Sequence, residues 1–173
     1  MRLAYADPPY LGCAKLYPEH PDAARWDDPL SHAMLLAELD DYDGWAYSLS
    51  STSLPVLLPY APHGTRVAAW VKPFAAFKRN VRIAYTWEPV LFKPGRDRSS
   101  EGAMVGRDYH SAPITTKRGT KGAKPESFCR WVLDLLGYVD GDELTDVFPG
   151  TGVMGRVVAQ GVLPMRSDEG EAA

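Results

Sequence analysis

The sequence has no long apolar segment, no cysteine pair with metal-ligand spacing and no internal repeat. No run of about 18 or more apolar residues occurs, which argues against a membrane span. The first residues hold no basic stretch followed by an apolar one, so no secretory signal is expected. The two cysteines, Cys13 and Cys129, are far apart. We therefore expect an intracellular protein with reduced thiols, and 173 residues suffice for one domain with a hydrophobic core.

Positive charge is scarce overall but concentrated in one stretch. The chain has 19 Lys and Arg against 22 Asp and Glu, a net charge of −3. Between Lys93 and Lys124 there are eight basic and three acidic residues, a local charge of +5 that leaves −8 for the rest. A basic strip on an acidic body fits a protein that meets phosphate groups on one face. A solvated loop whose charges only keep the chain soluble fits the composition equally well.

Hydrophobic periodicity predicts strands and helices in alternation. The predicted strands are 3–6, 45–49, 66–71, 81–92 (a strand or hairpin) and 143–148, and the predicted helices are 31–39, 51–58, 125–137 and 153–160. Ser31 is the expected cap of the first helix. This order predicts an α/β layered fold with a largely parallel sheet. Glu88-Pro89 is expected at a bulge or sheet edge, because proline cannot donate to a strand ladder.

The first predicted strand stops at Asp7-Pro8-Pro9-Tyr10, and ligands bind at the carboxyl ends of strands in open α/β sheets. The exocyclic amine of adenine or cytosine is a poor nucleophile, because its lone pair is delocalised into the ring. The Asp7 carboxylate and the Pro8 carbonyl can accept its two hydrogens, which orients the lone pair and stabilises the developing positive charge. The prolines hold these acceptors rigid, and Tyr10 would stack on a base that has left its helix. A strand that merely ends in a proline-rich turn is the alternative.

A second motif, Asp146-Val147-Phe148-Pro149-Gly150-Thr151-Gly152, predicts a strand, a glycine-rich turn and the start of a helix. Glycines let the backbone approach a ligand closely. The turn lacks the Lys-Ser/Thr pair of a phosphate-binding loop, and Pro149 does not suit a dinucleotide fingerprint. Alone, the motif fits an ordinary tight turn better than a cofactor site.

Together, the two motifs resemble the signatures of the DNA amino-methyltransferases. The catalytic motif comes first and the cofactor motif near the C-terminus, which is similar to the order of the permuted β class that methylates adenine N6 or cytosine N4. Lys124-Pro125 falls where that class has a Lys-Pro motif, opening the helix before the cofactor strand. The resemblance covers nearly the whole chain. It implies a Rossmann-like, circularly permuted S-adenosylmethionine-dependent methyltransferase fold as a single domain over residues 1–173.

The resemblance also implies roles for individual residues. The target base would be held by Asp7, Pro8, Pro9 and Tyr10. The cofactor S-adenosylmethionine would be held by Ala6, Asp7, Lys124, Pro125, Asp146, Phe148, Gly150, Thr151 and Gly152. The methyl group would pass directly from sulfonium to nitrogen, with no metal and no covalent enzyme intermediate. DNA is the implied partner, with adenine favoured over cytosine, so a cytoplasmic, nucleoid-associated location is expected.

The basic loop at about 93–124 occupies the place of the family's target-recognition region. The candidate nucleic-acid contacts are Lys72, Arg96, Arg98, Arg107, Lys117, Arg118 and Lys121. For Lys72, a solvated lysine at a strand end is the plainer interpretation.

The sequence departs from the family after the cofactor helix. The family fold continues into two further strands, the first ending in an acid that binds the ribose hydroxyls, whereas here fewer than about ten residues follow Pro164. We therefore expect a sheet shortened on the C-terminal side, whose exposed edge a second copy of the chain could cover as a homodimer.

Two alternatives remain open. One is a degenerate fold that binds cofactor or DNA without catalysis. The other is a methyltransferase for RNA or for a protein amide. Protein-glutamine methyltransferases have Asn at the Asp7 position, and one large RNA family prefers Trp at the Tyr10 position, which argues against both of the latter substrates.

Overall fold

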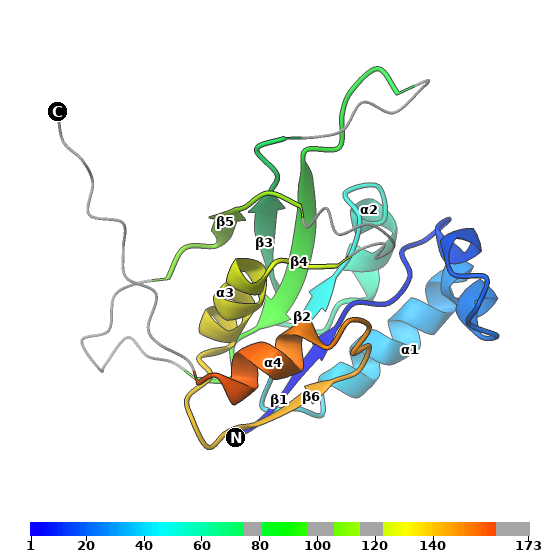
Figure 1. Ribbon diagram of the computed structural model, residues 1–173. Helices are drawn as coiled ribbons and strands as arrows, with labels where there is room; N and C mark the ends of the chain where they lie inside the picture. Colours follow the sequence, from blue (N-terminus) through cyan, green and yellow to red (C-terminus); the bar gives the residue numbers. More distant parts are fainter. Residues whose placement is uncertain (75–80, 97–105, 115–122, 162–173) are drawn as a thin grey trace, which may run out of the picture.

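The computed structural model describes residues 1–74, 81–96, 106–114 and 123–161 (Figure 1). The strands are β1 Arg2–Ala6, β2 Gly44–Ser48, β3 Arg66–Val71, β4 Trp87–Lys93, β5 Tyr109–Ser111 and β6 Glu143–Asp146. The helices are α1 Pro29–Leu39, α2 Leu54–Leu57, α3 Glu126–Leu136 and α4 Val153–Ala159, with short 3-10 helices at Ala14–Leu16, Ala23–Asp27 and Leu58–Tyr60. The expected α/β fold is confirmed.

Within the described residues the strands form a six-stranded sheet in the order β5-β3-β4-β2-β1-β6. β1 is parallel to β2 and β6, and β3 is parallel to β5. β4 is antiparallel to both of its neighbours, β2 and β3. The sheet is therefore mixed rather than largely parallel, because β3 and β4, which follow one another along the chain, pair as antiparallel neighbours. The carboxyl ends of β1, β2, β3 and β6 and the beginning of β4 share one edge, called here the carboxyl edge.

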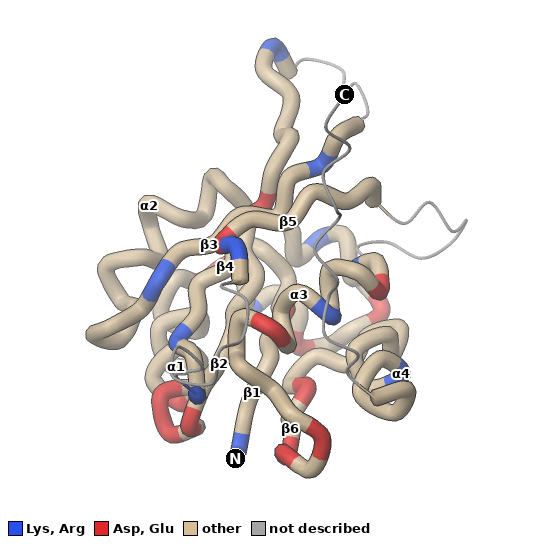
Figure 2. The backbone as a smooth tube through the Cα atoms, turned by 90° about the vertical axis from the view of Figure 1, so that its left-hand side faces the viewer, with Lys and Arg blue, Asp and Glu red and all other residues tan. Residues whose placement is uncertain are grey.

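The opposite edge of the sheet, the amino edge, carries a concentration of acidic side chains (Figure 2). They lie just before β2 and just before and at the start of β6: Asp40, Asp41, Asp43, Asp140, Asp142 and Glu143. Several are paired, since the amino group of Met1 lies 2.7 Å from Asp142 Oδ1 and the Arg2 amide donates to Asp43 Oδ2 at 2.7 Å. Part of the negative charge at this edge is thus balanced within the fold.

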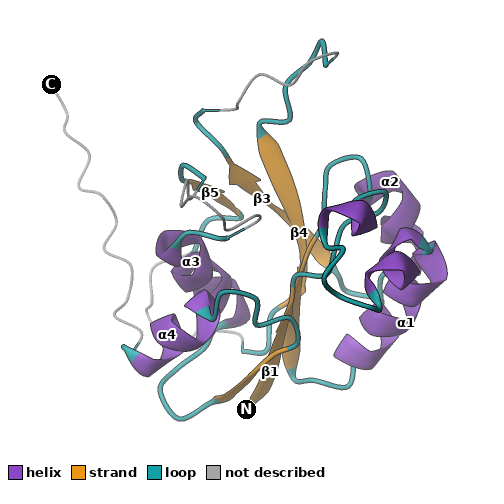
Figure 3. Cartoon of the chain, turned by 45° about the vertical axis from the view of Figure 1, so that its right-hand side comes forward, coloured by secondary structure: helices purple, strands orange, loops and turns teal. Residues whose placement is uncertain are grey.

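Helices cover both faces of the sheet, with α3 and α4 on one face and α1 and α2 on the other (Figure 3). Side chains alternate along a strand, so Tyr5 of β1 lies in the core under α3 while Ala4 and Ala6 lie in the core under α1. The core under α3 is rich in aromatic rings, among them Phe128 and Trp131, both fully buried.

The position of Pro89 corrects one sequence prediction. β4 lies inside the sheet and its pairing with β3 is continuous, so Glu88-Pro89 is not a bulge. The pairing of β4 with β2 begins at Val90, so this dipeptide has a strand partner on one side, β3. The Pro89 carbonyl accepts a hydrogen bond from the Leu49 amide at 3.3 Å. In an antiparallel pair, the nitrogen and the carbonyl of one residue face the same neighbouring strand, so the Pro89 nitrogen also faces Leu49. Leu49 lies just past Ser48, the last residue of β2. The bond that an amide at position 89 would donate to the Leu49 carbonyl is therefore missing, and an inner strand can hold this proline because the position lies just past the end of the β2–β4 ladder.

Several element ends also differ from the prediction. α1 begins at Pro29 rather than after Ser31, because the Asp28 side chain accepts a hydrogen bond from the Leu30 amide at 3.0 Å. β6 stops at Asp146, two residues early. Residues 81–86 lie outside β4, and the three-residue β5 has no counterpart in the prediction.

Other predicted ends are confirmed. α3 stops at Gly137, whose φ of 68° places it in the left-handed region.

Within the described residues, no helix has both the length and the apolar character needed to cross a bilayer.

Gly44, the first residue of β2, approaches Gly95 too closely to accept a side chain. A Cβ on Gly44 would lie 2.5 Å from the Gly95 Cα, a backbone atom that cannot rotate away. Gly44→Ala is expected to lower the free energy of unfolding by about 1–3 kcal/mol in urea denaturation. Gly155→Ala in α4 is the control, because nothing lies within 4 Å of its added Cβ; it should be neutral or stabilising by about 0.5–1 kcal/mol. Equal stability of the two variants would refute the close approach.

Candidate active site

The proline turn after β1 presents Asp7 and Tyr10 at the carboxyl edge. Pro8 and Pro9 fix the direction of the chain, and the Cys13 amide closes the turn on the Tyr10 carbonyl at 2.8 Å. The Tyr10 hydroxyl lies 3.2 Å from Asp7 Oδ1. The four predicted catalytic residues are thus brought together in one short turn.

Lys124 reaches into this turn from the segment before α3. Its ammonium nitrogen lies 2.9 Å from Asp7 Oδ1 and 2.9 Å from the Tyr10 hydroxyl oxygen. The side chain is only 8% exposed, and its nitrogen lies within 6 Å of the ring centres of Tyr10, Trp70 and Phe128. Aromatic faces attract a cation that has been removed from water. Lys124, predicted as a cofactor residue, therefore contacts the predicted catalytic carboxylate.

Glu88 is the site residue that sequence reasoning missed. Its Oε2 lies 2.8 Å from the Tyr10 hydroxyl and 3.5 Å from the Lys124 nitrogen, and its Oε1 forms an ion pair with Lys72. The signal was a charged residue at the position in β4 that alternates with Val90 and Phe92, both buried under α3. A charge on a core-facing strand position requires a partner.

The Tyr10 hydroxyl has one proton and two carboxylates within reach. The contact to Glu88, at 2.8 Å, is shorter than that to Asp7, at 3.2 Å. Glu88 is therefore the better acceptor for this proton. Asp7 Oδ1 is then left to accept from the Lys124 ammonium.

The two carboxyl groups are shifted in opposite directions. Burial raises the pKa of Asp7, and Lys124 offsets this only in part. Burial also acts on Glu88, but Lys124 and Lys72 outweigh it and lower the pKa of Glu88. For Lys124, Asp7 and Glu88 overcome the effect of burial and raise its pKa. Glu88 is thus held as an anion, while Asp7 is the more basic acceptor.

The glycine-rich turn lies beside Asp7, because β6 pairs with β1. Tyr5 is opposite Asp146 in the sheet, and the Val147 amide donates to the Tyr5 carbonyl at 2.9 Å. Gly150 and Gly152 have φ values of 43° and 68°, in the left-handed region that side chains disfavour. The glycine-rich turn therefore lies directly next to the turn that holds Asp7.

The remaining predicted cofactor residues lie around these two turns. Phe148 packs against Trp26, with ring centres 5.1 Å apart. The Thr151 carbonyl accepts a hydrogen bond from the Arg156 side chain at 2.7 Å. Pro125 directly precedes α3, and Ala6 is buried at the end of β1.

Asp146 holds an acceptor that nothing in the described residues satisfies. Its Oδ1 is buried without a hydrogen-bond partner there. Burial raises the pKa of this carboxyl, which the Phe148 amide partly opposes by hydrogen bonding to it. Because buried polar atoms are nearly always paired in native proteins, the unpaired oxygen fits a bound donor such as a ligand amine or hydroxyl. Among the described residues, no group of three or more His, Cys, Asp or Glu side chains could hold a metal ion.

Comparison with known proteins defines the fold. No protein-family model matches the chain, and no curated protein matches it. The crystal structure of the M1.HpyAVI–SAM complex superposes with a TM-score of 0.58 at 14% identity, covering 92% of this chain and 76% of that one. The crystal structure of M1.HpyAVI gives a TM-score of 0.49 at 14% identity, covering 92% and 75%. The fold is that of an S-adenosylmethionine-dependent methyltransferase.

In this methyltransferase fold, the predicted nucleic-acid residues are dispersed. Lys72 lies at the carboxyl edge beside Glu88, not in solvent. Arg96 lies at the amino edge, where it pairs with Asp142 at 2.8 Å, and Arg107 is exposed next to β5. Arg98, Lys117, Arg118 and Lys121 lie outside the described residues. Among the described residues of this set, only Lys72 lies near the Asp7 turn, through its ion pair with Glu88.

Removal of Lys124 should leave two buried carboxylates without their shared cation. Lys124→Met is expected to lower the free energy of unfolding at pH 7 by about 3 kcal/mol. The loss should shrink at acid pH: without Lys124 the pKa of Asp7 rises further, and the stability that its protonated form confers is present at low pH and lost as pH rises through that pKa. Urea denaturation between pH 5 and 8 measures both effects.

Lys93→Met is the matched control for this experiment. Its ion pair with Asp40, at 2.8 Å, is more than one-third exposed on both sides. Exposed pairs contribute about 1 kcal/mol or less. A Lys124→Met loss as small as that of the control, or one that does not change with pH, would contradict the buried network.

Proposed function

We propose that this protein transfers a methyl group from S-adenosylmethionine to an exocyclic amine of a nucleic-acid base. The single observation that carries the proposal is the Asp7 carboxylate at the end of β1, which accepts a hydrogen bond from the ammonium nitrogen of Lys124 at 2.9 Å and so can accept one from a nitrogen donor. The turn that holds this acceptor lies next to the glycine turn of β6 in a methyltransferase fold. Methylation of a base amine requires a group that accepts a hydrogen bond from that amine and lies beside the cofactor turn.

The chain's own residues would position the amine and stabilise its charge. Asp7 would accept one hydrogen of the incoming amine and the Pro8 carbonyl the other, so that the nitrogen lone pair points at the methyl donor. The raised pKa of Asp7 makes it a better acceptor for the positive charge that grows on nitrogen. Tyr10, with its hydroxyl held by Glu88, would stack on the base.

Lys124 would yield its place when the substrate enters. In the free protein its ammonium takes the hydrogen bond of Asp7 that the target amine would use. Glu88 Oε2 lies 3.5 Å from the same nitrogen, so the cation retains a carboxylate partner when Asp7 is engaged elsewhere. The site therefore remains charge-neutral before and after substrate entry.

S-adenosylmethionine would bind along the turn of β6 and supply a methyl group on a sulfonium, which is a good leaving group. The unpaired Oδ1 of Asp146 would accept from a donor of the cofactor, and the positive-φ glycines, Gly150 and Gly152, would let the backbone approach it. The M1.HpyAVI structure with a similar fold is a complex with SAM, which favours this cofactor.

The finer assignment follows the resemblance drawn from the sequence. The order of the motifs, with Asp7 before the glycine turn, favours the permuted β class with its Asp-Pro-Pro-Tyr motif. In this assignment, residues 1–173 form one domain. DNA is the preferred substrate and adenine N6 the preferred amine, with cytosine N4 second. β6 has no strand on its outer side within the described residues, which favours a second copy of the chain as cover.

Asp7→Ala should strongly reduce the rate of methylation without abolishing cofactor binding. Loss of a preorganised group that stabilises developing charge costs about 10²–10³-fold in rate. Transfer of a tritiated methyl group onto unmodified DNA, RNA and free nucleosides measures the effect and identifies the substrate. Asp40→Ala, an exposed carboxylate at the amino edge, is the control and should retain the activity. Activity retained by Asp7→Ala would remove the mechanism, and no transfer by the wild type would remove the proposed reaction.

Asp146→Ala should weaken binding of S-adenosylmethionine. A hydrogen bond to a charged group contributes about 1.5–3 kcal/mol, so the dissociation constant should rise about tenfold or more. Isothermal titration calorimetry measures it. Glu143→Ala, at the exposed start of the same strand, is the control. Unchanged affinity in Asp146→Ala would place the cofactor elsewhere, and no heat with the wild type at millimolar cofactor would leave only a non-catalytic fold.

A further inference from the structure

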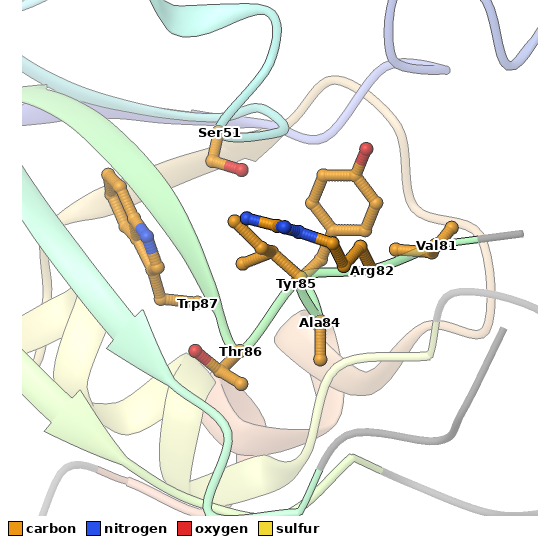
Figure 4. Close-up of a pocket in the computed structure, with 8 residues that line it drawn as sticks. Ser51, Val81, Arg82, Ala84, Tyr85, Thr86 and Trp87 are labelled. Atoms are coloured by element: carbon orange, nitrogen blue, oxygen red, sulfur yellow. The ribbon is translucent and has the colours of Figure 1, made fainter.

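A second hollow lies on the opposite face of β4 from the charged site. It has a volume of about 580 Å³ and is lined by Ser51, Val81, Arg82, Ile83, Ala84, Tyr85, Thr86 and Trp87 (Figure 4). A volume of a few hundred Å³ or more suits a molecule the size of a nucleotide. Nothing in the proposed chemistry uses this hollow.

The lining combines exposed rings with one cation. Tyr85 is 46% exposed and Trp87 is 36% exposed, and Arg82 adds a positive charge, with no acidic side chain in the lining. Contiguous exposed apolar groups usually mark a binding surface. Aromatic faces together with a guanidinium are the groups on which proteins stack unpaired nucleic-acid bases and pair their phosphates.

The hollow is fixed to the carboxyl edge by β4. Trp87 and Glu88 are consecutive and therefore point to opposite faces of the sheet, Glu88 toward Tyr10 and Trp87 into the hollow. The Lys72 amide donates to the Thr86 carbonyl at 2.7 Å, which ties the lining segment to the end of β3. Ser51 lies three residues beyond the end of β2, the strand next to β1. The hollow and the Asp7 turn thus border the same edge.

The charges around the hollow also favour a polyanionic ligand there. The acidic side chains described above gather at the amino edge (Figure 2). Asp7 and Glu88 at the carboxyl edge are paired with Lys124 and Lys72. Among the described residues that line the hollow itself, Arg82 is the one charged side chain, so the lining attracts a polyanion.

We infer that this hollow binds a nucleotide that flanks the target base in the substrate strand. Tyr85 and Trp87 stack on its base, and Arg82 pairs with its phosphate. Because Trp87 adjoins Glu88, a strand whose target base stands at Asp7 can place a neighbouring nucleotide here. The inference rests on the proposed function for the identity of the strand.

The experiment measures the affinity of a fluorescein-labelled, single-stranded 12-nucleotide DNA by anisotropy, using the full chain. Tyr85→Ala and Trp87→Leu should each weaken binding about 5- to 100-fold, the effect of losing one stacked base. Arg82→Gln should weaken binding and reduce the slope of log affinity against log salt by about one. Tyr60→Ala removes a ring that is also 46% exposed but outside the lining, and should leave affinity unchanged.

Two further measurements separate this inference from the proposed reaction. Calorimetry with S-adenosylmethionine checks that each variant is folded, and the ratio of methyl transfer onto the oligonucleotide to transfer onto free nucleoside should fall in Tyr85→Ala. Wild-type affinity in both ring variants overturns the inference, even if methylation is normal. If the wild type binds the oligonucleotide but never transfers a methyl group, weaker binding in the two ring variants still supports the nucleotide site. That result refutes only the proposed reaction.

Discussion

Burial of four charged side chains at one edge of the sheet is the constraint on which the site depends. Lys124 and Lys72 face Asp7 and Glu88 with little access to water. Charges removed from water destabilise a fold unless each finds a partner. Here the partners come from the turn after β1, the end of β3, the beginning of β4 and the segment before α3. The network therefore requires all four elements to meet. It also requires β4 to run antiparallel, because Glu88 stands at the beginning of β4 and only an antiparallel strand begins at the carboxyl edge.

The two edges of the sheet use their charges differently. At the amino edge, Arg96 holds the pKa of Asp142 well below its usual range, helped by the amino group of Met1. Arg96 also donates to the Gly137 carbonyl at 2.7 Å, so it ties the segment after β4 to the end of α3. This arginine thus links elements at the amino edge, whereas Lys72, among the described candidate residues, contacts the Asp7 network through Glu88. At the carboxyl edge, the glycine turn and the Asp7 turn leave acceptors for a ligand.

Local patterns predicted much of this arrangement. Short apolar runs predicted β1, β2, β3 and β6. Asp7 and the glycine turn could be proposed as site residues because each motif is contiguous, and Lys124 because of the family resemblance. Glu88 was missed because its role depends on Tyr10, a residue 78 positions away in sequence that only the fold brings near. The antiparallel direction of β4 depends on pairing and leaves no local signal either. The start of α1 was misplaced because Asp28 and Ser31 are both good caps, and Pro29 favours the earlier one.

The asymmetry between the two carboxylates bears on the proposed chemistry. Glu88 is held by two lysines and by the Tyr10 proton, so it has little capacity left for a substrate. Asp7 shares a single lysine and has a raised pKa. Positive charge develops on the amine nitrogen during methyl transfer. A carboxylate whose own negative charge is not already balanced by nearby lysines stabilises that charge best. In the proposed reaction, Glu88 would therefore act through Tyr10 and Lys124, whose positions would decide whether Asp7 is free to accept the amine.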